Sequence, residues 1–272
     1  MNRRGFLALL GLGGLAPISA RFASSEDGSG PDLSELEARG DVEQPAAGYQ
    51  RIVWSVDTDA PAAALTFDDG PDPEFTPAIL QILDRFDVTA TFFAMGYNAA
   101  RHPRLLREVV AAGHEIGSHG WRHLNLTETD PEETRKEIEL GHRTVEDHAE
   151  VPVRVFRPPY GRFSENAVRV LAPRPQDMVV WSVTRGKLSW EDPGLVAAHI
   201  AGSLKPGTII DLHDGIGRGT FNPRSAGAER LRRRRETEID ALPRILERVR
   251  DDDLRLLTVS RLLAAGANEA EA

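Results

Sequence analysis

Residues 64–71 decide the fold class, and they read Ala64-Leu65-Thr66-Phe67-Asp68-Asp69-Gly70-Pro71. A short apolar run passes directly into two carboxylates and a Gly-Pro turn, which is typical of a buried strand that ends at a turn. Other short apolar runs, also bounded by Gly, Pro or Asp, follow along the chain. We therefore expect strands at residues 63–67, 89–94, 114–118, 153–157, 178–183, 208–212 and 254–259.

Amphipathic stretches separate these runs. Apolar residues recur at helical spacing from Phe75 to Phe86, where Thr76 and Pro77 would supply the N-cap and the first turn. We expect further helices at residues 105–110, stopped by Gly113, and at 131–150, 164–171, 193–204 and 238–250. An earlier run at 51–56 would pair with the first strand in a hairpin. Strands that alternate with helices predict an α/β fold with a parallel sheet, either open or closed into a barrel.

Composition limits the kind of protein. The chain has 272 residues, 40% of them hydrophobic and 28% charged, which is typical of one large globular domain or two small ones. Its formal net charge of −9 argues against nucleic acid as a partner. There is no Cys, which excludes disulfides, thiolate ligands and a Cys nucleophile. A bound metal would therefore need His and carboxylate ligands.

The amino-terminal segment resembles an export signal. Arg3 and Arg4 precede a Gly-rich apolar run and the small residues Ser19 and Ala20, as in a twin-arginine signal. The alternatives are an ordinary secretory signal and a start that is not cleaved. The apolar run is too short for a stable membrane span. We expect an exported protein, secreted or in the cell envelope, with no stable membrane span once the signal is removed.

Four of the expected strands end in ionisable residues. The carboxyl ends of parallel strands meet at one edge of a sheet or barrel, and ligands bind there. Each residue taken alone has an ordinary structural explanation as a turn, a polar helix face or a buried histidine. The ordered set favours an active site, and its members are Asp68, Asp69, His119 with His123 four residues later, Arg157 and His213.

This set has the groups that metal-assisted hydrolysis requires. Asp69, His119 and His123 supply one carboxylate and two imidazoles, which leaves coordination positions open for water and substrate. Asp68 is available to take a proton from water, and His213 could protonate a leaving nitrogen or oxygen. Zinc suits these ligands best, and cobalt, nickel, manganese and iron are alternatives.

At these residues the chain resembles the polysaccharide deacetylase family, also called carbohydrate esterase family four or the nodulation-protein-B homology domain. The first three similar motifs are Thr66-Phe67-Asp68-Asp69-Gly70-Pro71, the stretch from His114 to His123, and Arg157-Pro158-Pro159-Tyr160-Gly161. The resemblance implies Asp68 as base, Asp69, His119 and His123 as metal ligands, and Arg157 as the residue that orients Asp68. It also implies an oxyanion contact from the Tyr160 backbone N–H, with Pro158 and Tyr160 beside the substrate.

Leu212-His213-Asp214 resembles the fifth motif of the family, which implies His213 as general acid and Leu212 in the acetyl pocket. The fourth motif differs from the family pattern, because residues 181–190 contain no Asp. In the family this Asp helps to tune the pKa of the acid histidine. Asp211 and Asp214 are the two candidates to replace it. Gly120 stands where the family usually has Ser or Thr.

The resemblance implies a fold and a domain plan. We expect a distorted (β/α)7 barrel as the single catalytic domain at residues 51–265, after a twin-arginine-type signal at 1–23 and a linker or disordered arm at 24–50. Residues 266–272 would be a flexible tail. The basic run 230–235 is interpreted as a solvated loop. Trp121 and Trp190 are candidates for stacking on sugar rings.

The resulting hypothesis is a monomeric hydrolase that removes acetyl groups, mainly N-acetyl groups, from a carbohydrate polymer such as peptidoglycan or a chitin-like glycan. The alternatives are a non-hydrolytic glycan-binding relative, a deacetylase of acetylxylan or a small acetamide, and an iron oxygenase with two His and one carboxylate.

Overall fold

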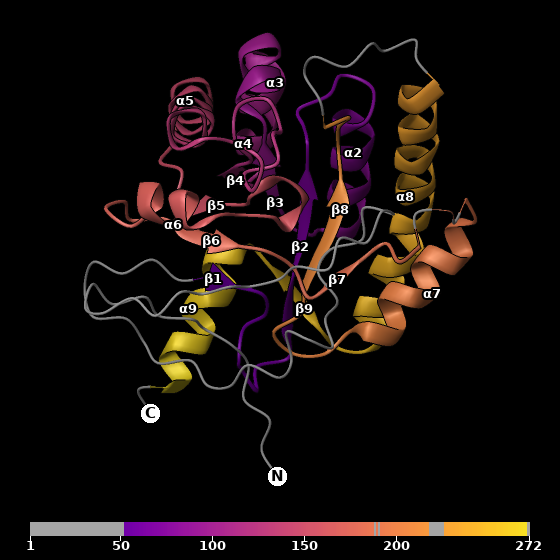
Figure 1. Cartoon of the computed structure of the whole chain (residues 1–272). Coiled ribbons are helices and arrows are strands. Elements are labelled where there is room, and N and C mark those ends of the chain that lie inside the picture. Colours follow the sequence, from indigo (N-terminus) through magenta and orange to yellow (C-terminus); the bar gives the residue numbers. More distant parts are fainter. Residues whose placement is uncertain (1–51, 188, 190, 218–225, 271–272) are drawn as a thin grey trace.

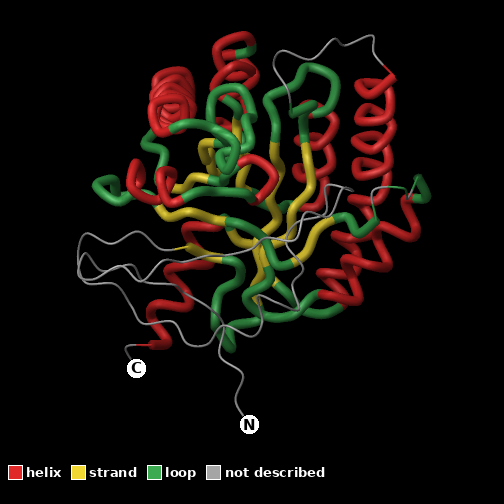
Figure 2. Tube along the Cα trace, in the orientation of Figure 1, coloured by secondary structure: helices red, strands yellow, loops and turns green. Residues whose placement is uncertain are grey.

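The protein is described by a computed structural model that covers residues 52–187, 189, 191–217 and 226–270. Its centre is a curled parallel sheet with helices packed around the outside (Figures 1 and 2). The strands are β1 (Ile52–Val53), β2 (Ala62–Asp68), β3 (Thr91–Ala94), β4 (Glu115–Ser118), β5 (Val155–Phe156), β6 (Asp177–Val179), β7 (Val183–Thr184), β8 (Ile209–His213) and β9 (Arg255–Leu257). The helices are α2 (Thr76–Phe86), α3 (Gly96–Arg101), α4 (Pro103–Ala111), α5 (Pro131–Ala149), α6 (Glu165–Leu171), α7 (Pro193–Ser203), α8 (Ala226–Asp251), α9 (Val259–Ala270) and the 3₁₀ turn η1 (Pro159–Gly161).

The strand order is β1-β6-β5-β4-β3-β2-β8-β7, with β9 paired to β2. Each of these pairings is parallel. Helices between successive strands make such parallel connections possible. The prediction of a single α/β domain of the distorted β/α-barrel type is confirmed, in the form of a curled half-barrel.

Alternating side chains divide the strands into two faces. On β2, Leu65 and Phe67 belong to the apolar cluster under the outer helices, whereas Ala62 and Ala64 belong to the cluster on the inner face. Thr66 and Asp68 continue the inner face, because side chains two residues apart point the same way. The inner face of β2 thus changes from apolar to acidic toward its carboxyl end.

One expected strand is divided into two short strands that lie toward opposite ends of the sheet. Residues 178–183 were expected to form a single strand, but β6 pairs with β1 and β5 whereas β7 pairs with β8. The backbone between β6 and β7 bonds first to β1 and then to β8, because the N–H of Val180 donates to the carbonyl of Val53 and the N–H of Ser182 donates to that of Ile209. This stretch therefore connects the two edges and brings them toward closure.

Two details of the expected local structure were wrong. The segment at 51–56 does not form a hairpin with β2, because β1 lies parallel to β6, with Ile52 opposite Met178. The N-cap of α2 is Phe75, and the Thr76 hydroxyl instead donates to Asp214 Oδ2 at 2.6 Å. Buried tertiary partners explain both differences, since neither strand pairing nor a distant carboxylate can be recognised in a local pattern.

The carboxyl-terminal half contains more helix than expected. The helix expected at 238–250 extends over Ala226–Asp251, so the basic run 230–235 is helical and not a loop. Its inward residues include Arg235 and Glu238, so apolar periodicity could not reveal this part of the helix. The last helix continues to Ala270, so the tail expected at 266–272 is helical over its described part. The expected signal and linker at 1–50 lie outside the described residues.

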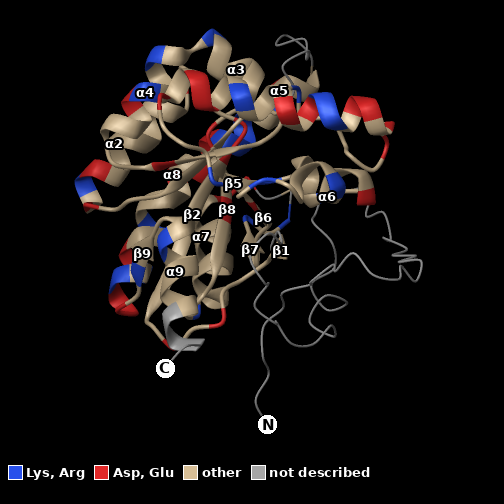
Figure 3. Cartoon of the chain, turned by 90° about the vertical axis from the view of Figure 1, so that its left-hand side faces the viewer, with Lys and Arg blue, Asp and Glu red and all other residues tan. Residues whose placement is uncertain are grey.

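The outer surface carries charges of both signs, which are interspersed along α5 (Figure 3). Among the helices that the structure describes, none has the length and apolar character needed to span a bilayer.

Candidate active site

The carboxyl ends of β2, β4, β5 and β8 bring the predicted polar residues to one edge of the sheet. Asp68 ends β2 and lies in register with His213, which ends β8. His119 follows Ser118 of β4, and Arg157 follows Phe156 of β5. A buried polar site has thus formed where parallel strands leave the barrel.

Asp69, His119 and His123 form a compact buried cluster. One potential ligand atom from each lies within 4.8 Å of the others. The Oδ1 atom of Asp69 lies 3.2 Å from Nε2 of His123 and 3.7 Å from Nε2 of His119. Within the described part of the chain this buried oxygen has no hydrogen-bond partner. Three donor atoms that converge in this way fit a divalent metal with the His₂–carboxylate set of catalytic zinc sites.

The ring of His119 is held in an orientation that suits a metal ligand. Its Nδ1 lies 2.8 Å from the backbone carbonyl of Arg157, so Nδ1 carries the proton and Nε2 keeps its lone pair. Burial lowers the pKa of His119 to about 4, although Asp69 opposes this shift. The imidazole is therefore neutral at physiological pH, as metal binding requires.

Burial would raise the pKa of Asp69, but the charges of His123 and Arg235 outweigh it and lower the value to about 2. The carboxylate is thus ionised. The Arg235 guanidinium lies 3.0 Å from Asp69 Oδ2, on the opposite side from the two imidazoles that face Oδ1.

Asp68 is held by Arg157. The guanidinium donates from NH1 to Asp68 Oδ1 at 2.7 Å and from NH2 to the carbonyl of Val180 at 2.7 Å. Arg157 is fully buried and its guanidinium lies 4.0 Å above the ring of Phe93. Burial raises the pKa of Asp68 to about 6, against the opposing charges of Arg157 and His213. A carboxylate with this pKa can accept a proton near neutral pH.

Three site residues have backbone conformations that L-residues rarely adopt. Asp69, His123 and Tyr160 have φ values of 79°, 63° and 61°. Such strain is concentrated at functional sites, where the surrounding structure maintains it. The ring of Tyr160 lies 4.4 Å from that of His123, in an edge-to-face arrangement. Tyr160 is half-buried and Pro158 is buried in the same turn.

Leu212 and Trp190 were both expected to contact the substrate. Leu212 was expected to line an acetyl pocket, but it is fully buried in the apolar cluster under the outer helices. Because side chains alternate along β8, Leu212 points away from the face that carries His213 and Asp211. The expectation for Leu212 is therefore wrong. Trp190 lies outside the described residues.

Asp211 and Asp214, the two candidates to replace the missing fourth-motif aspartate, have other hydrogen-bond partners. Asp211 accepts from Arg157 at 3.1 Å and from Thr184 at 3.3 Å. Asp214 accepts from the Gly70 backbone N–H at 3.0 Å and from the Thr76 hydroxyl at 2.6 Å. Burial raises the pKa of each to about 7.

The partner of His213 comes from α8 and was not among the residues predicted from the sequence. Nδ1 of His213 lies 3.1 Å from Glu238 Oε2, and the backbone N–H of His213 donates to the same oxygen at 2.9 Å. Burial would lower the pKa of His213, but Glu238 and Asp211 raise it to about 9 in spite of Arg235. The spacing of Arg235 and Glu238, three apart on one helix face, was the signal available in the sequence.

Glu137 was also missed. It is almost fully buried on α5, and its Oε1 accepts the backbone N–H groups of Arg122 and Leu124. These two residues flank His123, so Glu137 fixes the loop that carries this imidazole. The loop is thus tied down without a hydroxyl at position 120, where Gly120 has a φ of 75°.

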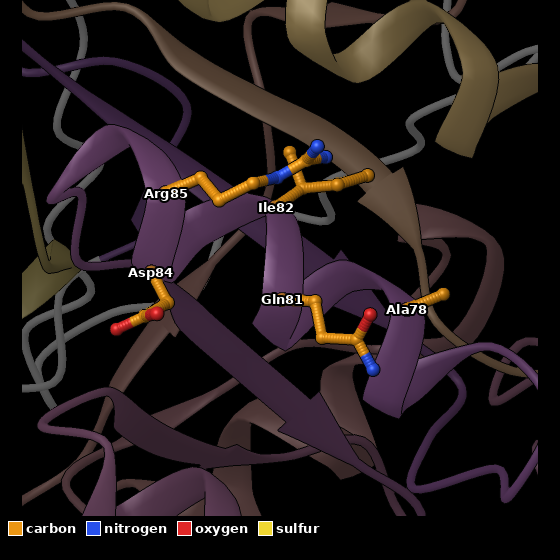
Figure 4. A pocket seen from close by; sticks show the side chains of 5 residues that line it. All are labelled: Ala78, Gln81, Ile82, Asp84 and Arg85. Carbon is orange, nitrogen blue, oxygen red and sulfur yellow. The ribbon is translucent and has the colours of Figure 1, made fainter.

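A surface hollow on α2 is separate from this site. Its lining residues are Ala78, Gln81, Ile82, Asp84 and Arg85, and none belongs to the polar cluster (Figure 4).

Comparison with known proteins gives the family. A family model described as polysaccharide deacetylase matches residues 55–177. A peptidoglycan-N-acetylglucosamine deacetylase of Bacillus cereus is 33% identical over 218 residues, which cover 79% of this chain and 93% of that protein. A chitooligosaccharide deacetylase of Sinorhizobium fredii is 37% identical over 170 residues, or 61% of this chain and 78% of that protein. A solved structure of a peptidoglycan N-acetylglucosamine deacetylase has a TM-score of 0.69 and 28% identity, and the match covers 78% of this chain and 92% of that chain. The chain belongs to the polysaccharide deacetylase family.

Proposed function

We propose that this protein is a metal-dependent deacetylase that hydrolyses N-acetyl groups of a glycan and releases acetate. Asp69, His119 and His123 hold the metal, Asp68 is the base and His213 is the general acid. Arg157 orients Asp68, and the Tyr160 backbone N–H contributes to oxyanion binding. Pro158 and Tyr160 border the substrate.

The observation that carries this proposal is the arrangement of Asp68 beside the three-residue cluster. Asp68 Oδ2 lies 3.5 Å from Nε2 of His119, while Asp68 Oδ1 is bonded to Arg157. A proton acceptor with a raised pKa therefore adjoins the position where the three ligand atoms converge. Hydrolysis of an unactivated amide needs this combination of base and electrophile.

The chemistry can be assigned to the residues of this chain. Asp69, His119 and His123 would hold a divalent metal, which would supply Lewis acidity toward the acetyl oxygen and the attacking water. Asp68 accepts a proton from the water molecule while the water oxygen forms a bond to the acetyl carbon. His213 donates a proton to the sugar nitrogen as the carbon–nitrogen bond breaks. The products are acetate and a free amino sugar.

The substrate assignment rests on the relatives. Two of them are named for peptidoglycan N-acetylglucosamine and for chitooligosaccharides, which share an N-acetylated sugar. We therefore propose that its substrates are N-acetylated glycans of the peptidoglycan or chitin-like class. Zinc is the proposed metal, and the protein is proposed to act as a monomer outside the cytoplasm after export by the segment 1–23. The catalytic domain begins near residue 51 and includes α9.

The direct test is acetate release from chitooligosaccharides, peptidoglycan and acetylxylan by protein treated with chelator and then reloaded with zinc or cobalt. We expect zinc- or cobalt-dependent release from at least one N-acetylated glycan. Release from acetylxylan alone would change the substrate class to O-acetyl esters. A protein that binds glycan but releases no acetate with the metal bound would be a glycan-binding relative.

A further inference from the structure

Glu238 lies at the centre of a buried ionic cluster beside His213. The residue is 1% exposed. Its Oε2 atom accepts the backbone N–H of His213 and contacts the ring Nδ1 of the same residue. Its Oε1 atom lies 3.3 Å from Nε of Arg185 and 3.4 Å from NH1 of Arg235. Both oxygens are engaged, so the carboxylate is held in one orientation.

We propose that Glu238 is the positioning residue for His213, and that it replaces the aspartate absent from the fourth motif. This inference rests on the deacetylase function proposed above, in which His213 protonates the leaving nitrogen. Glu238 contributes from a helix that begins more than thirty residues after the fourth motif, so no local sequence pattern connects the two.

The contact determines which nitrogen of His213 can act. A carboxylate only accepts hydrogen bonds, so the Nδ1 atom that faces Glu238 carries a proton. The transferable proton must then be on Nε2, which is the nitrogen that Glu238 does not bind. A carboxylate in this position also stabilises the imidazolium form that a general acid needs, as the buried aspartate does in serine-protease triads.

Arg185 connects this arrangement to the divergent motif itself. It directly follows β7, within the stretch where the fourth-motif aspartate is missing, and it is 1% exposed. A buried carboxylate needs paired charges to remain ionised. The fourth-motif stretch thus lacks an aspartate but supplies Arg185, whose positive charge pairs with the Glu238 carboxylate on α8.

Arg235 extends the cluster to the metal ligands. It lies one helical turn before Glu238, and besides Glu238 it contacts Asp69 Oδ2 at 3.0 Å and the carbonyl of Gly215 at 2.6 Å. A continuous series of contacts therefore runs from His213 through Glu238 and Arg235 to Asp69. The other carboxylate on the same face, Asp211, is bonded to Arg157 and Thr184, so it is not the hydrogen-bond partner of the His213 ring.

The experiment compares Glu238→Gln, Glu238→Asp and His213→Ala in the zinc-loaded full-length protein. Rates are measured on a chitooligosaccharide and on 4-nitrophenyl acetate, whose phenolate leaves without protonation. We expect Glu238→Gln to lose about 100-fold on the glycan, which is a typical general-acid effect, and less than about threefold on the ester. Glu238→Asp keeps the charge and should recover part of the glycan rate. The double variant Glu238→Gln/His213→Ala should be no slower than His213→Ala alone.

The matched control is Glu236→Gln, the same change at an exposed position of the same helix, which should leave both rates unchanged. Equal losses on both substrates, or additive losses in the double variant, would overturn the positioning role. Nitrogen-15 NMR of the His213 ring gives an answer that does not depend on activity, because the proposal requires a proton on Nδ1 in the parent. A ring without that proton would refute it. A parent that releases no acetate from any glycan would refute the deacetylase function instead, and the NMR result would still decide the contact.

Discussion

Arg157 holds two groups of the site at once: NH1 donates to Asp68 Oδ1 at 2.7 Å, and its backbone carbonyl accepts from His119 Nδ1 at 2.8 Å. One residue thus orients the proposed base through its side chain and a proposed metal ligand through its main chain. A substitution at position 157 removes only the first contact, because the carbonyl belongs to every residue. The two functions of Arg157 can therefore be separated by experiment.

The Arg157→Lys variant should retain bound metal but lose activity. Lysine keeps the positive charge but cannot reproduce the several directed hydrogen bonds of the guanidinium, so Asp68 is held less firmly. We expect a loss in kcat of about tenfold to 100-fold, on the scale of a disturbed general base. Metal content measured beside acetate release tests this, and loss of the metal would show that the side chain also supports the ligand loop.

The pH dependence should have an acidic limb set by Asp68. The carboxylate is active when deprotonated, and burial raises its pKa from 3.8 to about 6. Activity is therefore lost as the pH falls through the pKa of Asp68. A divalent cation at Asp69 adds positive charge nearby and lowers the pKa of Asp68, so the limb of the zinc enzyme should lie below about 6. The profile of kcat/KM measures it, and a limb well above 6 would contradict the assignment.

The Asp68→Asn variant should abolish turnover and leave metal binding intact. The amide cannot accept the proton of water, whereas Asp69, His119 and His123 are unchanged. Acetate release should fall to background while zinc remains at one per protein, as measured by elemental analysis. Loss of zinc in this variant would mean that Asp68 is a ligand and not only a base.

The His213→Ala variant should slow amide hydrolysis by about 100-fold or more, because the leaving nitrogen loses its proton donor. Circular dichroism and metal content should match the parent, since His213 is partly exposed. An unchanged rate would remove His213 from the mechanism.

The Gly141→Ala variant should disturb the loop that carries His123. A Cβ atom at Gly141 would lie 2.3 Å from the backbone carbon of Gly120, so α5 and the loop must move apart. Overpacking of this kind costs about 1–3 kcal/mol in the free energy of unfolding. Thermal unfolding and zinc affinity are the measurements. Gly202→Ala is the control, because a Cβ there meets no atom within 4 Å.

The local sequence was sufficient to predict most of the strands and to select three residues that together could hold a metal. Asp69 and His119 come directly after the strands that precede them, and His123 follows His119 by four residues, so the end of each strand and the chemistry beside it could be predicted together. The parallel sheet then required these ends to meet. By contrast, the pairing of β1 and the division of residues 178–183 depend on which edges the curling sheet brings together.

The sequence by itself determined the β/α alternation, the family motifs and the residues that can hold a metal, because each of these is a local pattern of polarity and spacing. Only the tertiary structure decided the partner of His213. Glu238 and Arg235 lie on a helix face whose inward residues are charged, so hydrophobic periodicity gave no sign of their burial. Their roles depend on contacts with Asp69, 166 residues from Arg235, and with Arg185 and His213. These long-range contacts have no signature in a single sequence, since the charges become complementary only when the fold removes them from water.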